Sequence, residues 1–344
     1  EGTVADAVKQ AADGGIDVTT ASPLRENAGI AFQGPVKVGS FDIPGDLARS
    51  WLSHPNPNGR SNADVLRPWA NGQDVSKRPS DTWIIDFGAE MPERDALLYE
   101  TPIAHVIEHV KPMREAGNRE GRKRYWWRHG ETVPAFRRAT AGIARYLATI
   151  RVAKHRFFVW LPTAVLPDSR LYAISRDDDL TFGILHSRMH EVWALANASM
   201  HGVGNDPTYN AKTCFEAFPF PAGMTPADTA AGAPAGPLAE AIAIAARRLN
   251  ELRENWLNPA EWVDRVPEIV PGFPDRIIPK PGHEAELKKR TLTNLYNLRP
   301  AWLDSAHKAL DAAVATAYGW TDYTPEMPED EILRRLLALN LERA

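Results

Sequence analysis

The residues in this sequence best able to do chemistry are basic and aromatic side chains crowded into one window. Residues 111–160 hold 13 basic and 3 acidic side chains, whereas the whole 344-residue chain has a formal net charge of −4. Tyr125, Trp126 and Trp127 lie among the cations. Cations mixed with aromatic rings suit a phosphate backbone, because they release counterions and also stack. The open alternative is a solvated face whose arginines pair with the acidic first hundred residues.

Two glycine-containing loops carry side chains that can read the edges of base pairs. Residues 56–62 read NPNGRSN, and residues 201–210 read HGVGNDPTYN. Arginine pairs with guanine and asparagine pairs with adenine in the grooves of DNA. Ordinary turns require the same residue types, so plain loop structure is the alternative interpretation.

Other kinds of chemistry find little support. His186 and His190 have a spacing that places both on one face of a helix, but no third metal ligand accompanies them. Cys214 lies in an apolar run, which favours a buried side chain over a nucleophile. The sequence has no G-x-S-x-G, G-x-G-x-x-G or P-loop motif. We therefore predict no catalytic residue and no metal site in this chain.

Strands and helices must position these side chains. β-Branched and aromatic residues that end at a glycine predict a strand over residues 82–88. A helix is expected from residue 186, with Met189 and Trp193 buried and the polar residues off that face. Those polar residues are His186, Arg188, His190 and Glu191. Further strands are expected at residues 156–162, 170–176 and 180–187, with a tight turn at Asp177–Asp179 and a long loop at 54–69.

The pattern changes after a run of small residues and prolines. Residues 222–236 read AGMTPADTAAGAPAG, and the residues that follow carry apolar side chains at helical spacing. The predicted fold class is α+β, with a mixed-sheet domain followed by a C-terminal helical domain. The expected parts are a linker at 1–22, the sheet domain at 23–221, a second linker at 222–236 and the helical domain at 237–344.

Composition excludes several classes of protein. A charged fraction of 24% and a hydrophobic fraction of 44% are typical of a folded chain. No run approaches the roughly 18 apolar residues that span a bilayer. A single cysteine excludes a disulfide framework within one chain, which favours a reducing, cytoplasmic compartment. Because the chain begins at Glu1 without an initiator methionine, we expect it to be a piece of a longer protein.

Six segments in the same order carry a resemblance to a known family. They are residues 55–69, 83–88, 125–131, 151–161, 182–195 and 201–221. The helical C-terminal end of the chain shows the same resemblance. Together they resemble the target-recognition domain of the MmeI-like, type IIL restriction–modification enzymes, which are large class I DNA methyltransferases of bacteria.

The resemblance implies transfer of a methyl group from S-adenosylmethionine to adenine N6 within a short DNA site. The F-x-G-x-G and N-P-P-[YF] motifs of that chemistry do not occur in this sequence. We expect them, and the S-adenosylmethionine site, in an upstream methyltransferase domain of the same parent chain. The expected partners are therefore double-stranded DNA and that domain, with no membrane, and the parent acts in restriction–modification or phage defence.

Site residues follow from the basic window, the loops and the resemblance. The expected DNA backbone contacts are Arg122, Lys123, Arg124, Arg128, Arg151, Lys154, His155, Arg156 and Arg188. The candidate base readers are Asn58, Arg60, Asn62, His201, Asn205, Asp206, Thr208, Tyr209, Asn210 and Lys212. The competing hypothesis is a scaffold segment that docks on the methylase or nuclease domains, with minor DNA contact, because surfaces rich in arginine and tryptophan also form protein interfaces.

Overall fold

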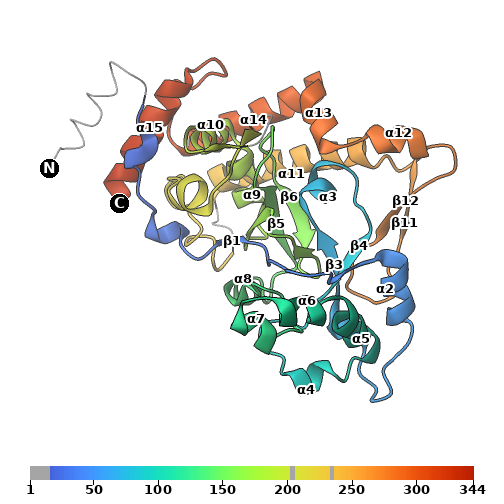
Figure 1. Ribbon diagram of the computed structural model, residues 1–344. Helices are drawn as coiled ribbons and strands as arrows, with labels where there is room; N and C mark the ends of the chain where they lie inside the picture. The colour runs from blue at the N-terminus through green and yellow to red at the C-terminus, as the bar shows by residue number, and fades with distance from the viewer. Residues whose placement is uncertain (1–15, 202–205, 233–235) are drawn as a thin grey trace.

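The computed structural model describes residues 16–201, 206–232 and 236–344. Its strands form two four-stranded sheets and two short hairpins (Figure 1). The first sheet, β1-β8-β5-β6, is antiparallel, whereas the second, β2-β4-β3-β7, pairs β3 with β7 in parallel. The strands are β1 (Ala31–Gln33), β2 (Asp42–Pro44), β3 (Leu66–Ala70), β4 (Thr82–Ile85), β5 (Arg145–Ile150), β6 (Val159–Pro162), β7 (Leu166–Pro167), β8 (Leu171–Ile174), β9 (Met200–His201), β10 (Asp206–Pro207), β11 (Val263–Val266) and β12 (Arg276–Pro279).

Helices cover the sheets and dominate the second half of the chain, which confirms the α+β class and its helical C-terminal region. They are α2 (Gly45–Leu52), α3 (Gly72–Ser76), α4 (Glu93–Ala96), α5 (Glu100–His109), α6 (Lys111–Ala116), α7 (Glu120–Arg124), α8 (Pro134–Ala139), α9 (Asp179–His186), α10 (Arg188–Ala196), α11 (Pro237–Leu257), α12 (Glu284–Lys289), α13 (Leu292–Leu298), α14 (Ala301–Ala317) and α15 (Glu329–Arg343). Short turns are η1 (Val18–Thr20), η2 (Arg25–Asn27), η3 (Asn62–Asp64) and the π-helical η4 (Ala211–Glu216). None of the helices in the described part is long and apolar enough to cross a membrane.

The segment expected as a strand at 180–187 is instead the helix α9. The carboxylate of Asp178 accepts the backbone N–H of Thr181 at 2.6 Å and so begins the helix in place of a hairpin turn. Every residue of α9 after the first is buried, so its apolar run carries no periodicity that distinguishes a helix from a buried strand. A Cβ at Gly183 would lie 2.7 Å from the Ile242 side chain, so this glycine lets α9 pack closely against α11.

Other expectations agree with the structure more closely. The expected strands at 82–88 and 170–176 contain β4 and β8, and the expected helix at 186–196 contains α10. The long loop at 54–69 ends earlier than expected, because its last residues form β3.

Two hydrophobic cores organise these elements. The larger core joins the first sheet and α9 and α10 to α11, α14 and α15, so it includes residues on both sides of segment 222–236. Arg176 donates to the Thr229 hydroxyl at 3.1 Å and so ties that segment to β8. The smaller core lies between the second sheet and α5 and α8. The division of the chain into domains at 222–236 stays a prediction.

Candidate nucleic-acid interface

The fold divides the basic window 111–160 between two surfaces. α7 and α8 precede the first residue of β5, whereas residues 151–156 follow its last residue (Figure 1). Six extended residues span about 20 Å, so the two groups of cations are separated by the length of a strand. Trp126 and Trp127 are buried in the smaller core and are not available to stack on a ligand.

The guanidinium groups of Arg128 and Arg156 make hydrogen bonds within the protein and are not available for a phosphate. The guanidinium of Arg128 donates to the carbonyl oxygens of Ala89 at 2.7 Å and Met91 at 2.8 Å. Arg156 is 9% exposed, donates to the Thr149 hydroxyl at 2.9 Å and lies over the Tyr209 ring. Both expected backbone contacts are therefore corrected: main-chain and hydroxyl oxygens satisfy these guanidinium groups, as they satisfy other buried donors.

The remaining cations after β5 share a surface with the second polar loop. An isolated bridge pairs Val152 with Thr208, and the Tyr209 N–H donates to the Arg151 carbonyl at 2.7 Å. These contacts join two segments that carry four exposed side chains, and we call the exposed side of these joined segments the loop surface. Its members are Arg151, Lys154, Asn210 and Lys212. In the described part of the chain, no carboxylate lies within ion-pair distance of its three cations.

The other members of the second loop have different roles. Tyr209 is 1% exposed, and its hydroxyl lies 3.1 Å from Nε2 of His190 in the core. Thr208 is also buried, so neither residue reads a base, contrary to expectation. Asp206 is half-buried in β10. Asn205 and the side chain of His201 lie outside the described residues.

One atom of the Asn210 side-chain amide already makes a hydrogen bond within the protein. Its Oδ1 accepts the backbone N–H of Lys212 at 2.9 Å and thereby caps η4. A bidentate contact with adenine needs both atoms of the amide group, so this cap competes with it. Lys212, two residues further on in η4, is exposed.

The first polar loop, residues 56–62, is mostly internal structure. Asn62 is 2% exposed, donates to the Trp51 carbonyl at 2.9 Å and accepts from Asn56, so it does not read bases. Asn58 is exposed and donates to Leu98 O at 2.7 Å. Arg60 is exposed, with its guanidinium 5.7 Å from the centre of the Tyr99 ring.

The helix α7 carries the other cluster of cations, Arg122, Lys123 and Arg124, which we call the α7 surface. Lys123 pairs with Glu120 at 2.9 Å, and Arg124 lies over the Tyr125 ring. Arg124 is exposed and Arg122 is half-exposed, so this surface keeps most of its positive charge in contact with solvent.

His155 and Arg188 connect the sheet region to the C-terminal helices. Nε2 of His155 and Nζ of Lys154 lie 2.8 and 2.9 Å from Oδ1 of Asn297 on α13. Arg188 donates through Nη1 to the Pro325 carbonyl at 3.1 Å. Both residues are half-buried, so their expected DNA contact competes with these internal bonds.

A buried cluster of histidines was missed by the sequence analysis. His186 and His190 lie inside the larger core and not on a polar helix face, which corrects the expectation. Nε2 of His186 accepts from Arg253 at 2.8 Å and from the Phe158 N–H at 3.0 Å. His307 joins the same cluster and lies 3.1 Å from the Tyr296 hydroxyl. A buried arginine on a long amphipathic helix leaves no signal in the hydrophobic pattern, because most arginines at such positions are exposed.

Burial keeps these histidines neutral. It lowers the pKa of His190 and of His307 to about 3, and the pKa of His186 falls well below its usual range for the same reason, aided by the Arg253 charge. The described residues contain no group of three or more His, Cys, Asp or Glu side chains able to hold a metal ion. Cys214 is buried and its pKa is raised by burial, as expected of an unreactive thiol.

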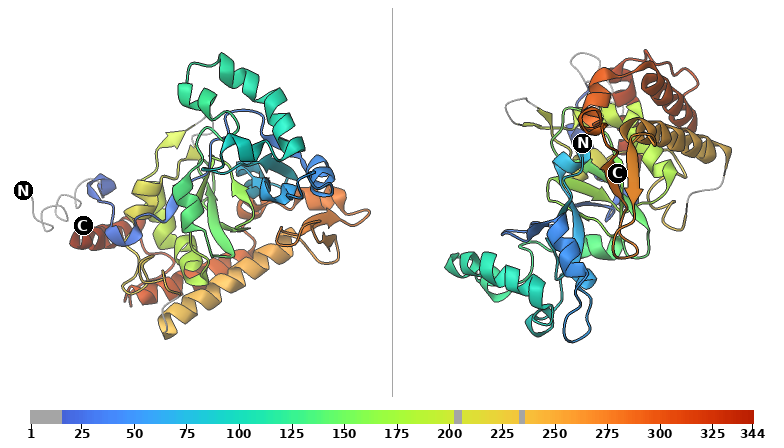
Figure 2. Two further views of the ribbon diagram at one scale, coloured as in Figure 1. Left: turned by 90° about the horizontal axis from the view of Figure 1, so that it is seen from below. Right: turned by 90° about the vertical axis from the view of Figure 1, so that its right-hand side faces the viewer.

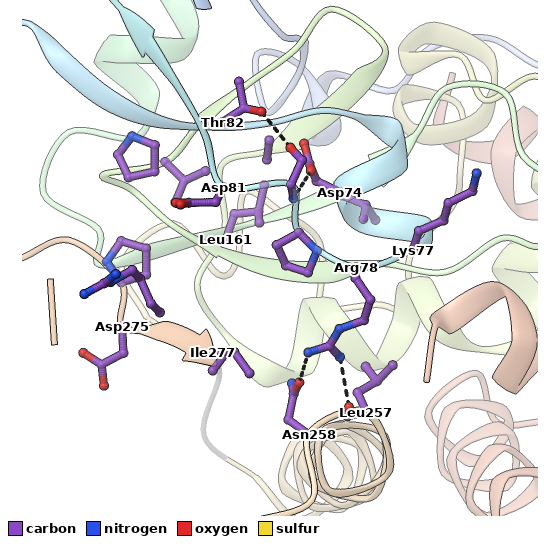
Figure 3. Close-up of a pocket in the computed structure, with 18 of the residues that line it drawn as sticks. Asp74, Lys77, Arg78, Asp81, Thr82, Leu161, Leu257, Asn258, Asp275 and Ile277 are labelled. Atoms are coloured by element: carbon purple, nitrogen blue, oxygen red, sulfur yellow. Dashed lines mark hydrogen bonds between the residues drawn. The ribbon is translucent and has the colours of Figure 1, made fainter. Parts of the chain in front are cut away.

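A cavity of about 640 Å³ lies where the β11–β12 hairpin meets the two sheets (Figure 3). Arg78 points from one wall to Asn258 Oδ1 and the Leu257 carbonyl, at 2.7 and 2.9 Å. At another wall, Arg49 bonds Asp81 at 2.6 Å and Glu268 at 3.1 Å. Arg49, through Glu268, fastens the β11–β12 hairpin to α2, whereas Arg78 ties the segment before β4 to the end of α11.

Comparisons with known proteins identify a solved structure with a related fold. No family model and no curated protein matches this chain. A solved structure of the type IIL restriction–modification enzyme MmeI in complex with DNA matches with a TM-score of 0.64 and 16% sequence identity, over 95% of this chain. The chain spans 38% of that enzyme's chain. The two proteins therefore share a related fold.

Proposed function

We propose that this chain recognises duplex DNA as the C-terminal, target-finding part of an S-adenosylmethionine-dependent adenine methyltransferase. The observation that carries the proposal is the loop surface. A bridge between Val152 and Thr208 joins the two remote segments that carry the exposed cations Arg151, Lys154 and Lys212. Cations on polar loops can bind phosphates for position and base edges for specificity. The fold shared with a DNA-bound restriction–modification enzyme supports the same conclusion.

The two basic surfaces adjoin elements that extend from one side of the molecule. In the right-hand view of Figure 2, the β9–β10 hairpin and helices α5–α8 extend from the same side of the molecule, near its upper and lower ends. The hairpin adjoins the loop surface, and α7 carries the second cluster of cations. A duplex that crosses this side would meet both.

This chain holds and reads the DNA, and methyl transfer belongs to a separate domain. An enzyme that modifies a base must extrude that base from the duplex, while other contacts keep the DNA in register. The sequence lacks the cofactor and catalytic motifs of the transfer, and its buried histidines and cysteine are bonded within the core. We therefore assign S-adenosylmethionine to a methyltransferase domain elsewhere in the parent and derive no step through it here.

The test is binding to random-sequence duplex DNA across a salt series. The logarithm of the affinity should fall linearly with the logarithm of the salt concentration, by about 0.9 per phosphate neutralised. Exchanging Arg151 and Lys154 together for alanine should reduce that slope by about 2. Arg334→Ala is the matched control, because Arg334 is an exposed arginine on α15 that already pairs with Glu331. Absence of binding at low salt would contradict the proposal and favour the docking hypothesis.

A further inference from the structure

The helical C-terminal region reaches the loop surface through one turn. Asn297 lies near the end of α13. Its Oδ1 accepts a hydrogen bond from Nζ of Lys154 and lies within hydrogen-bond distance of Nε2 of His155. Two residues later, Arg299 adopts a left-handed conformation with φ of 42° and ends the helix. Leu298 lies between them and exposes 70% of its surface, the largest fraction among the exposed large apolar residues of the described part.

Single exposed leucines are common on protein surfaces and need no explanation. Leu298 is different because other exposed apolar side chains gather on the segments that it adjoins. Val152, two residues before Lys154, is 37% exposed, and Met200, which pairs with Pro207, is 50% exposed. The Ala153 N–H donates to Pro207 O at 3.4 Å and ties these segments together. Three parts of the chain thus present apolar groups beside the same cations.

The position of Leu298 is fixed by its neighbours. Tyr296 is buried against Phe157, with ring centres 5.4 Å apart, so the helix turn before Leu298 is anchored in the core. Arg299 pairs with Asp304 at 3.3 Å on the other side. A left-handed conformation is costly for a residue other than glycine, and such positions cluster at active sites, ligand-binding sites and switch regions.

We propose that Leu298 is an apolar contact to the base pairs of bound DNA, so that the C-terminal helical region takes part directly in recognition. This inference rests on the proposed function. The occupant is DNA and not another protein because exposed cations flank the apolar groups along the chain: Arg299 follows Leu298, and Arg151 and Lys154 lie on either side of Val152. A protein interface core is typically depleted of charge, whereas proteins that bind the minor groove combine arginine and lysine contacts with apolar side chains inserted between base steps.

The test compares Leu298→Ala with the unaltered chain on a duplex that the unaltered chain selects from a random library. Affinity should fall about tenfold, from the loss of partly buried methyl and methylene groups. The dependence on salt should keep its slope, because leucine releases no counterion. Leu298→Met, which keeps a long apolar side chain, should restore most of the affinity. Ile244→Ala is the control, because Ile244 is 55% exposed on α11 and carries no expected DNA contact.

The possible results separate the two proposals. Equal affinities of the unaltered chain and Leu298→Ala would overturn the inference and leave the proposed function standing. A tenfold loss for Ile244→Ala as well would also overturn it, because the loss would not be local to the turn. Absence of any DNA binding by the unaltered chain would overturn both.

Discussion

Arg253 on α11 donates a hydrogen bond through Nη1 to Nε2 of His186 on α9, over 2.8 Å, inside the larger core. Its Nη2 donates to the carbonyl oxygen of Phe158 over the same distance. The residue is 2% exposed, so its partners are protein atoms and not water. Polar contacts as well as apolar packing therefore join the sheet region to the C-terminal helices.

Replacing Arg253 with methionine should destabilise the whole chain. The Phe158 carbonyl would stay buried without a donor, and a buried unsatisfied polar group costs about 1–3 kcal/mol. Chemical denaturation would measure the loss of unfolding free energy. Arg248→Met is the control on the same helix, because the Arg248 side chain is 63% exposed and a surface change of that kind stays within about 0.5 kcal/mol. Equal losses in the two variants would show that the buried contacts contribute no net stability.

Stability should increase with pH through the mildly acidic range. His190 and His307 have pKa values near 3 in the folded chain because of burial, against 6.5 as the ordinary value. The unfolded chain therefore binds more protons than the folded chain between about pH 3 and 6.5, so stability rises with pH across that window. His186 acts in the same direction. Urea titrations from pH 4 to pH 7 would measure the slope.

Asp311 should oppose this trend in part. Burial raises its pKa from 3.8 to about 7, so the folded chain retains a proton on Asp311 that the unfolded chain releases from about pH 4. Its contribution to stability is complete below pH 4 and is lost as the pH rises to about 7. Asp178, Glu191 and Glu216, whose pKa values burial also raises, act in the same direction as Asp311. His105 and His129, whose pKa values burial lowers, add to the effect of the three core histidines, so we expect a net increase with pH. Asp311→Asn removes one opposing group and should steepen it; a flat profile in the unaltered chain would contradict the neutral histidine cluster.

The elements most visible in the sequence are those with one buried and one exposed face. α11 follows from its apolar stripe, and β4 from its β-branched run ended by a glycine. α9 was assigned wrongly because it is surrounded by protein, so its sequence is apolar at every turn. Position within the core, and not local propensity, decides between helix and strand in such a segment.

The candidate site was harder to predict, for a reason particular to arginine and asparagine. Arg128, Arg156 and Asn62 have the side chains that a DNA-binding surface requires, yet their hydrogen-bonding groups meet main-chain carbonyls inside the protein. The sequence shows the donors but not their acceptors. Arg151 and Lys154 face solvent, although they belong to the same basic window.

The α7 surface should contribute to DNA binding without reading sequence. Exchanging Arg122, Lys123 and Arg124 for alanine should weaken binding to all duplexes alike and reduce the salt slope by up to about 3, since each cation releases about one counterion. Anisotropy titrations on random and on selected duplexes would measure both quantities. An unchanged slope would place the duplex on the loop surface alone.

Lys212 should supply part of the sequence preference. It is exposed on the loop surface, and a lysine can donate to O6 and N7 of guanine in the major groove. At one base pair, Lys212→Ala should lose about 1–3 kcal/mol of discrimination between the preferred base and the others. A mismatched base pair costs the unaltered chain a similar amount. Selection from a random library, with and without the change, measures the preference position by position. Arg151→Ala is the comparison, because a phosphate contact lowers affinity for every sequence equally. If Lys212→Ala behaves as Arg151→Ala does, Lys212 binds the backbone and does not read a base.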